Sequence, residues 1–170
     1  MTGGQLSTLA APRNDLAAWY KLYAPLVYRR GLQILRSEAE AREVLQDVFL
    51  SLVENPSQFR GASSPTTWLY SATTHRCLNL LRNRRTQTRL LEQHGEFQPI
   101  AGEPCPPDTF LVLASALSEL PDEVAAAAVY FHLDGMSYEE IAELLACSRR
   151  TVAELLASLR TIVPAKGNQT

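Results

Sequence analysis

The chain has 170 residues, of which 46% are hydrophobic, and its net charge is −2 at neutral pH. This hydrophobic content is enough for one or two small folded domains and excludes an intrinsically disordered chain. No apolar run is long enough to span a membrane, and the first residues lack the basic and then apolar pattern of a secretory signal. Three widely spaced cysteines fit a reducing compartment. We therefore expect a cytoplasmic protein without membrane insertion.

The charge is unevenly distributed along the chain. Residues 1–90 carry 12 Lys and Arg against 6 Asp and Glu, whereas residues 91–170 carry 4 against 12. A basic first half is typical of a protein that contacts a nucleic acid. The acidic second half is unexpected in a DNA-binding domain, because cationic contacts to phosphates supply much of the affinity for DNA.

The first 90 residues show apolar periodicities of three helices. The first helix is expected over residues 15–35. The second is expected from Ser37, which has Glu40 three residues later in a capping-box pattern, to a stop at Asn55-Pro56. The third follows a loop and is expected from Thr66 to about Arg85. The apolar stripe of the second helix is expected to contain Val44, Leu45, Val48, Phe49, Leu52 and Val53.

A change of composition separates this region from the rest of the chain. Residues 95–108 contain four of the ten prolines and two glycines, with little periodicity. Such a segment is expected to be an extended linker. Helices are expected again over residues 110–120 and, after Pro121, from Asp122 to about Leu133.

The most informative motif lies between Ser137 and Leu156. Ser137 and Glu140 again have the spacing of a capping box, and Ser148 can cap a second helix after a short break. Two short helices joined by a tight turn are typical of a helix-turn-helix, in which the second helix enters the DNA major groove. On periodicity alone, two helices of an ordinary bundle fit equally well.

These patterns predict an all-α protein with two small helical domains joined by a proline-rich linker, the second domain containing a helix-turn-helix. The expected boundaries are residues 12–90 for the first domain, 91–110 for the linker, 111–164 for the second domain and 165–170 for a tail. Neither half contains a phosphate-binding glycine loop, metal-ligand spacing or a catalytic triad pattern. We therefore expect no enzyme, no cofactor and no metal.

The motifs together resemble a known family. The run YAPLVYRRGLQILRSEAEAREVLQDVFLSLVENPSQFRG, followed by TWLY and LNLLRNRR, resembles region 2 of bacterial sigma factors. The run LSELPDEVAAAAVYFHLDGMSYEEIAELLACSRRTV resembles region 4. A short linker between the two regions points to the extracytoplasmic-function (ECF) group. The resemblance covers roughly residues 15–163. It implies a promoter-specificity subunit that binds core RNA polymerase, promoter DNA in double-stranded and locally single-stranded form, and an anti-sigma factor.

The resemblance assigns a polymerase-binding role to the second helix. Members of the family dock this helix on the clamp of the polymerase through polar groups around a Gln-acidic pair. Glu43, Gln46 and Asp47 stand at those positions and share one helix face. Without the resemblance, the same face is better explained as the solvated side of an amphipathic helix.

The resemblance also implies contacts to the −10 promoter element. Members capture a flipped base beside the loop that precedes the third helix, which requires aromatic or apolar walls and cations for phosphates. The main role of Trp68 is expected to be core packing. Members often have Asn where His75 stands and a basic residue where Ser71 stands, so the base preference cannot be carried over. The candidates are Phe59, Arg60, Ser63, Trp68, His75, Arg76, Arg82, Arg84 and Arg85, of which the last three repel one another unless a polyanion is present.

Region 4 of the family binds the −35 element through the second helix of its helix-turn-helix. Members commonly have a Lys-Ser-Arg run where Ala153, Glu154 and Leu155 follow here, and often a basic residue where Phe131 stands. The −35 affinity of this domain alone is therefore expected to be weak. The candidates are Ser148, Arg149, Arg150, Thr151 and Glu154.

Two functions remain open at this point. The first is a promoter-specificity subunit that assists strand opening, which the Gln46–Asp47 pair and the arginines at 82–85 favour. The second is a polymerase-independent helix-turn-helix regulator, or a degenerate sigma-like protein that binds only protein partners, which the acidic second half favours. The sequence does not identify the promoter, the inducing signal or the anti-sigma factor.

Overall fold

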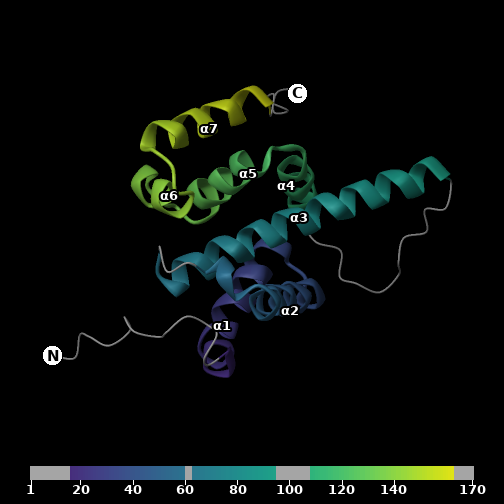
Figure 1. The fold of residues 1–170 in the computed structure, drawn as a ribbon. Coiled ribbons are helices and arrows are strands. Elements are labelled where there is room, and N and C mark those ends of the chain that lie inside the picture. The colour runs from purple at the N-terminus through teal and green to yellow at the C-terminus, as the bar shows by residue number, and fades with distance from the viewer. Residues whose placement is uncertain (1–15, 60–62, 95–107, 163–170) are drawn as a thin grey trace. The chain divides into compact units, whose positions relative to one another are not determined.

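The computed structural model describes residues 16–59, 63–94 and 108–162 (Figure 1). Within these ranges every regular element is a helix, and none of the helices is long and apolar enough to cross a membrane. The chain forms two compact units, Met1–Cys77 and Leu78–Thr170. The boundary between them falls inside α3 (Pro65–His94).

The first unit is built on a close pair of helices, α1 (Leu16–Leu35) and α2 (Glu38–Glu54). Arg36 adopts a positive φ of 56° between them, and Ser37 caps α2 by accepting a hydrogen bond from the Glu40 backbone N–H at 3.4 Å. The cap predicted at Ser37 is thus confirmed. A Cβ atom added at Gly31 would lie only 3.2 Å from the Ala41 Cα atom, so the two helices touch through these small residues.

The core of the first unit lies between α1, α2 and the first half of α3. Its side chains are Trp19, Tyr23, Val27, Ile34, Leu35, Ala41, Val44, Val48, Phe49, Leu52, Leu69 and Cys77. The expectation that Val53 belongs to this core is wrong, because its side chain is 54% exposed. Val53 follows the buried Leu52 and is turned by about 100° around the helix, away from Val48.

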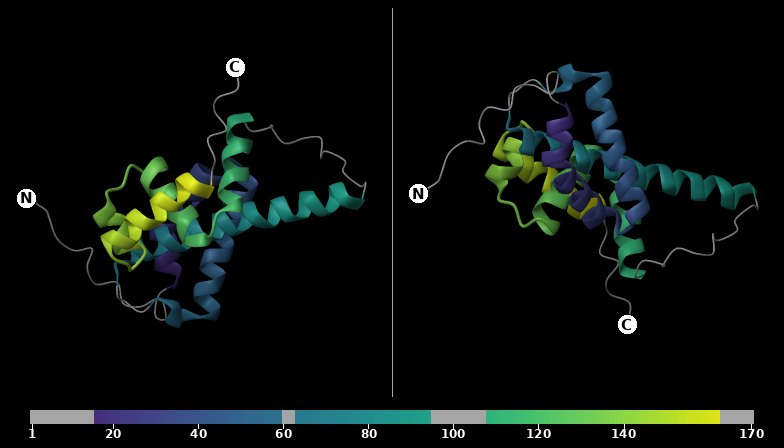
Figure 2. Two further views of the ribbon diagram at one scale, coloured as in Figure 1. Left: turned by 90° about the horizontal axis from the view of Figure 1, so that it is seen from above. Right: turned by 90° about the horizontal axis from the view of Figure 1, so that it is seen from below.

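A single 3-10 turn, η1 (Pro56–Gln58), leads toward α3. Figure 2 shows α3 as one continuous helix. It extends nine residues beyond the predicted end at Arg85, because no glycine or proline interrupts it before Gly95.

The second unit combines the second half of α3 with α4 (Asp108–Glu119), α5 (Asp122–Ala128), the π-helical segment η2 (Val129–Leu133), α6 (Tyr138–Leu144) and α7 (Arg149–Ile162). The helices α5 and α6 both pack against α7. Four consecutive buried alanines on α5 keep the helices close, and the larger buried side chains of this unit include Leu78, Leu81, Leu120, Tyr130, Ile141, Val152 and Leu156.

The helix-turn-helix caps follow the predicted pattern. The Ser137 hydroxyl accepts a hydrogen bond from the Glu140 backbone N–H, and the Glu140 carboxylate accepts one from the Ser137 backbone N–H at 2.8 Å. Ser148 accepts a hydrogen bond from the Thr151 backbone N–H at 3.1 Å. Ala146, with a φ of 51°, turns the chain between the two helices. Both predicted caps are therefore confirmed.

Candidate functional site

The α2 residues predicted to bind a partner lie on one exposed face. Glu43 and Gln46 are exposed and Asp47 is half-buried, whereas Val44 and Val48 on the other side are buried. The face also carries Leu50 and Val53, each 54% exposed. We call Glu43, Gln46, Asp47, Leu50 and Val53 the α2 stripe. Leu50 and Val53 come four and seven residues after Gln46, which places them on the same face.

Sequence reasoning missed the two apolar members of the α2 stripe. Exposed large apolar side chains flanked by polar ones are typical of a protein-binding surface. A signal was available, because Phe49 and Leu50 are adjacent and one helix face cannot bury both. The spacing of Leu50 from Gln46 indicated which of the two is exposed.

Phe59 directly follows η1 and packs against the core of the first unit. Its ring packs edge to face on Trp19, with the centroids 5.2 Å apart, and on Trp68, with the centroids 6.0 Å apart. Trp19 is fully buried, and both Phe59 and Trp68 are half-buried. These rings form a rigid apolar platform at the start of α3.

The other predicted −10 residues on this part of the chain differ in their exposure. Ser63 and Arg76 are exposed, and His75 is half-buried. Arg60 lies outside the described residues.

A buried arginine beneath α3 was missed by sequence reasoning. Arg30 is only 2% exposed, its Nε donates a hydrogen bond to the Thr74 hydroxyl at 3.1 Å, and its guanidinium stacks 4.1 Å from the centre of the Tyr70 ring. Arginines on amphipathic helices are usually exposed, so no local pattern indicated this. Next to it, burial raises the pKa of the Cys77 thiol to about 12, although the positive charge of Arg30 opposes the shift. Cys77 is therefore a protonated, unreactive core side chain.

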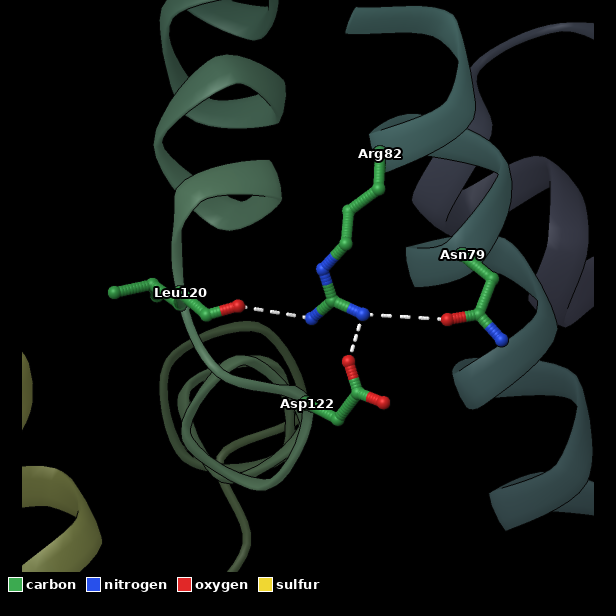
Figure 3. A network of polar contacts seen from close by, with 4 residues as sticks. All are labelled: Asn79, Arg82, Leu120 and Asp122. Carbon is green, nitrogen blue, oxygen red and sulfur yellow. Dashed lines mark hydrogen bonds and ion pairs between the residues drawn. The ribbon is translucent and has the colours of Figure 1, made fainter. Parts of the chain in front are cut away.

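Two arginines in the second half of α3, Arg82 and Arg85, are paired with carboxylates. Figure 3 shows the Arg82 guanidinium between Asn79, Leu120 and Asp122. One Nη donates to the Asp122 carboxylate and to Asn79, and the other donates to the Leu120 carbonyl at 2.9 Å. Arg85 is paired with Glu119 at 2.5 Å. The prediction that these arginines repel one another without a polyanion is therefore wrong for Arg82 and Arg85, because side chains of α4 and α5 supply the opposite charge.

A basic groove lies beside these ion pairs. It is lined on α3 by Leu81, Arg84, Arg85, Thr88 and Arg89, and on α4 by Ala114, Ser115 and Ser118. None of these lining residues is acidic, so the groove favours anionic groups.

The arginines at the start of α7 are also paired with carboxylates. Arg149 contacts Glu139 of α6 at 2.8 Å, and Arg150 contacts Glu154 one turn further along α7 at 2.9 Å. The Arg150 side chain remains 89% exposed. Thr151 is half-buried, and its hydroxyl lies 2.9 Å from that of Ser148. Glu154, itself one of the −35 candidates, thus neutralises a second candidate, Arg150.

Two family models match this chain. Residues 19–87 match sigma-70 region 2, and residues 110–158 match sigma-70 region 4. The chain belongs to the sigma-70 family, as an ECF-type sigma factor. This sigma factor is therefore a promoter-recognition subunit of RNA polymerase.

Curated relatives agree with this assignment. The chain is 29% identical over 153 residues to the ECF RNA polymerase sigma factor SigM of Mycobacterium tuberculosis, covering 89% of this chain and 76% of SigM. It is 29% identical over 157 residues to the RNA polymerase sigma factor YlaC of Bacillus subtilis, covering 87% and 89%. It is 26% identical over 140 residues to the ECF RNA polymerase sigma-E factor of Escherichia coli, covering 73% and 72%.

A solved structure has a similar fold. It is the sigma factor RpoE of Bartonella quintana in complex with the anti-sigma factor NepR, with a TM-score of 0.50 and 19% identity. The match covers 87% of this chain and 93% of that chain.

The described part of the chain holds no cluster of three or more His, Cys, Asp or Glu placed to bind a metal ion. The described residues instead form the exposed α2 stripe and the basic groove lined by α3 and α4.

Proposed function

We propose that this sigma factor divides its task among three surfaces. The α2 stripe binds core RNA polymerase. The region around Phe59, Trp68 and the basic residues of α3 binds the −10 element and its separated strand. The start of α7 binds the −35 element.

The observation that carries this proposal is the composition of the α2 stripe. The polar residues Glu43, Gln46 and Asp47 share this face with two apolar side chains. These are Leu50 and Val53, which are each more than half exposed. Protein interfaces commonly combine an apolar centre with a polar rim in this manner. The opposite face of α2 is buried against its own unit, so the stripe is the face of this helix that a partner can reach.

A binding titration with core polymerase tests this role. Replacing Gln46 and Asp47 with Ala is expected to weaken binding by ~1–3 kcal/mol, since these are polar anchors of the interface. Leu50→Ala is expected to add to this loss. The matched control replaces Glu38 and Arg42, an exposed ion pair on the flank of the same helix, with Ala. Core affinity that is equal for the stripe variant and the control would remove the α2 stripe from the interface.

The geometry around Phe59 supports the assignment of the −10 contact. Trp19 and Trp68 fix the Phe59 ring, so the following loop starts from a rigid apolar support. Arg76 is exposed on α3 and can approach a phosphate. A captured base needs such an apolar wall and neighbouring cations.

The start of α7 supports the assignment of the −35 contact. Arg150 is almost fully exposed, and the α7 N-terminus presents its backbone N–H groups toward any phosphate in reach. The pairing of both arginines with carboxylates reduces their attraction for DNA. We therefore infer that the second domain needs polymerase to hold it on the −35 element.

The remaining assignments follow from the family. We infer that this sigma factor acts in the cytoplasm, where it would meet RNA polymerase, and that it has no active site of its own. We also infer that an anti-sigma factor regulates it, as NepR binds RpoE in the solved complex. The domain boundaries proposed from the sequence, 12–90 and 111–164, enclose these surfaces.

A further inference from the structure

A corner between α4 and α5 holds two arginines of α3. Glu119 is the last residue of α4 and Asp122 is the first residue of α5. We call these two residues the acidic corner. The acidic corner and the second half of α3 belong to the same compact unit.

The acidic corner uses the donors that a phosphate would need. Both terminal nitrogens of Arg82 donate hydrogen bonds, to Asp122, Asn79 and the Leu120 carbonyl. Arg85 donates one to Glu119. Carboxylate and phosphate oxygens are recognised by the same planar guanidinium donors. Arg82 therefore cannot bind a DNA phosphate with these groups while the acidic corner is in place.

The contacts are strong enough to occupy the arginines and weak enough to be displaced. The Arg82 side chain is 23% exposed, and its partner Asp122 is 62% exposed. Arg85 and Glu119 are 45% and 50% exposed. Ion pairs with this much solvent access contribute little net free energy and are screened by salt. A polyanion that brings several phosphates can replace them.

The basic groove gives such a polyanion a place to begin. The groove contains Arg84 and Arg89 as well as Arg85, and its walls include the hydroxyls of Thr88 and Ser115. A DNA strand whose phosphates occupy this groove lies next to the acidic corner. Arg82 and Arg85 can then bind further phosphates only if the carboxylates of Glu119 and Asp122 move away.

We propose that the acidic corner is an internal competitor of promoter DNA, which occupies Arg82 and Arg85 in the chain alone and must leave before they bind phosphates. The proposal rests on the proposed use of the α3 arginines in binding the separated strand. It implies that nucleic acid and the acidic corner exclude each other.

The test measures the binding of the full chain to a labelled single-stranded DNA oligonucleotide of mixed sequence over a range of salt concentrations. Glu119→Gln with Asp122→Asn is expected to raise affinity roughly two- to thirtyfold, the range that two partly exposed ion pairs can supply. The slope of log affinity against log salt is expected to steepen by roughly 1.4, because each freed arginine adds about 0.7.

The matched control is Glu123→Gln with Glu143→Gln, which makes the same change in net charge at exposed positions of the same unit. Since Asp122 begins α5, the single variant Glu119→Gln leaves the first turn of that helix intact. It is expected to steepen the salt slope by roughly 0.7. Equal affinity and slope for the corner variants and the control would overturn the proposal.

A double-mutant cycle separates this proposal from the function on which it rests. Replacing Arg82 and Arg85 with Ala is expected to change affinity little in the wild-type background and to lower it strongly when the acidic corner is neutralised. If the two arginine substitutions lower affinity equally in both backgrounds, the arginines bind DNA and the acidic corner does not compete. If they have no effect in either background, the proposed DNA contact itself is wrong.

Discussion

Two arginines of α3, Arg82 and Arg85, and two of α7 are neutralised by carboxylates, but by carboxylates at very different distances along the chain. Arg150 is paired with Glu154 four residues later, and Arg149 with Glu139 of the neighbouring helix. Arg82 and Arg85 are paired with residues 40 and 34 positions away. The first kind of pairing is part of the local fold, whereas the second requires α4 and α5 to lie on α3.

This difference separates two ways of limiting DNA affinity. A carboxylate close to its arginine in the sequence stays beside it in every conformation of the domain, and so lowers DNA affinity permanently by a small amount. A distant carboxylate can be withdrawn by a change of conformation and therefore turns a contact on or off. The comparison predicts that substituting the paired α7 arginines lowers DNA affinity in the otherwise unchanged chain. Substituting Arg82 and Arg85 of α3 is predicted to lower it mainly once the acidic corner has been neutralised.

The largest expected effect that tests this comparison is at Arg150. Arg150→Ala is expected to reduce binding of the full chain to a promoter duplex by ~1–3 kcal/mol, since this exposed side chain can reach a base edge or phosphate. The duplex is one selected from a random library by the polymerase-bound sigma factor. The comparison fails if this variant binds as well as wild type while Arg82→Ala with Arg85→Ala loses most of the affinity.

A smaller effect is expected at the cap of α6, whose first turn carries the Arg149 partner Glu139. Ser137→Ala is expected to lower the free energy of unfolding by about 0.5–2 kcal/mol. The hydrogen bonds from Ser137 lower the pKa of Glu140. Because the pKa of Glu140 is depressed in the folded state, its ionised carboxylate stabilises the fold fully at neutral pH. This stabilisation is lost as the pH falls through the folded-state pKa, which lies below the ~4.3 of an ordinary glutamate.

Thermal unfolding from about pH 7 down to about pH 3 measures this contribution. The difference in stability between wild type and Glu140→Gln is expected to be present at neutral pH and to shrink in acid. A difference that stays constant over this range would show that the Glu140 carboxylate is not stabilised by the cap.

The smallest effect is expected at Glu154. Glu154→Gln frees Arg150 and removes a negative charge near the DNA, and an exposed pair of this spacing is worth ~0.3–0.5 kcal/mol. Duplex affinity is therefore expected to rise about twofold at low salt, with a gain that shrinks as salt increases. Glu143→Gln is the control for net charge. A gain that is independent of salt, or equal in the control, would mean that the Arg150–Glu154 pair does not limit binding.

The sequence predicted the features of the fold that depend on near neighbours. The caps at Ser37, Ser137 and Ser148 were found because each cap and its acceptor or donor lie three residues apart. The Arg150–Glu154 pair was equally local and could have been found from its spacing. The end of α3 was placed too early, although Gly95 marks it.

The sequence could not predict features that join distant segments. The pairing of Arg82 with Asp122 spans 40 residues, and no local pattern identifies such a partner. The burial of Arg30 depends on Tyr70 and Thr74 of another helix. The roles of the candidate site residues in binding polymerase and DNA stay predictions, because they depend on partners that lie outside this chain.

The close approach of Gly31 to Ala41 limits which sequences this protein can evolve. A methyl group at position 31 would press on both the Cα and the Cβ of Ala41, at 3.2 and 3.3 Å, and the backbone of α2 would have to move by a few tenths of an ångström. The α2 stripe is carried on the far side of the same helix, so such a shift would move the stripe while leaving its side chains unchanged. Variation at residues 31 and 41 is therefore coupled, and substitutions at this buried contact would displace the proposed polymerase-binding surface without changing any of its side chains.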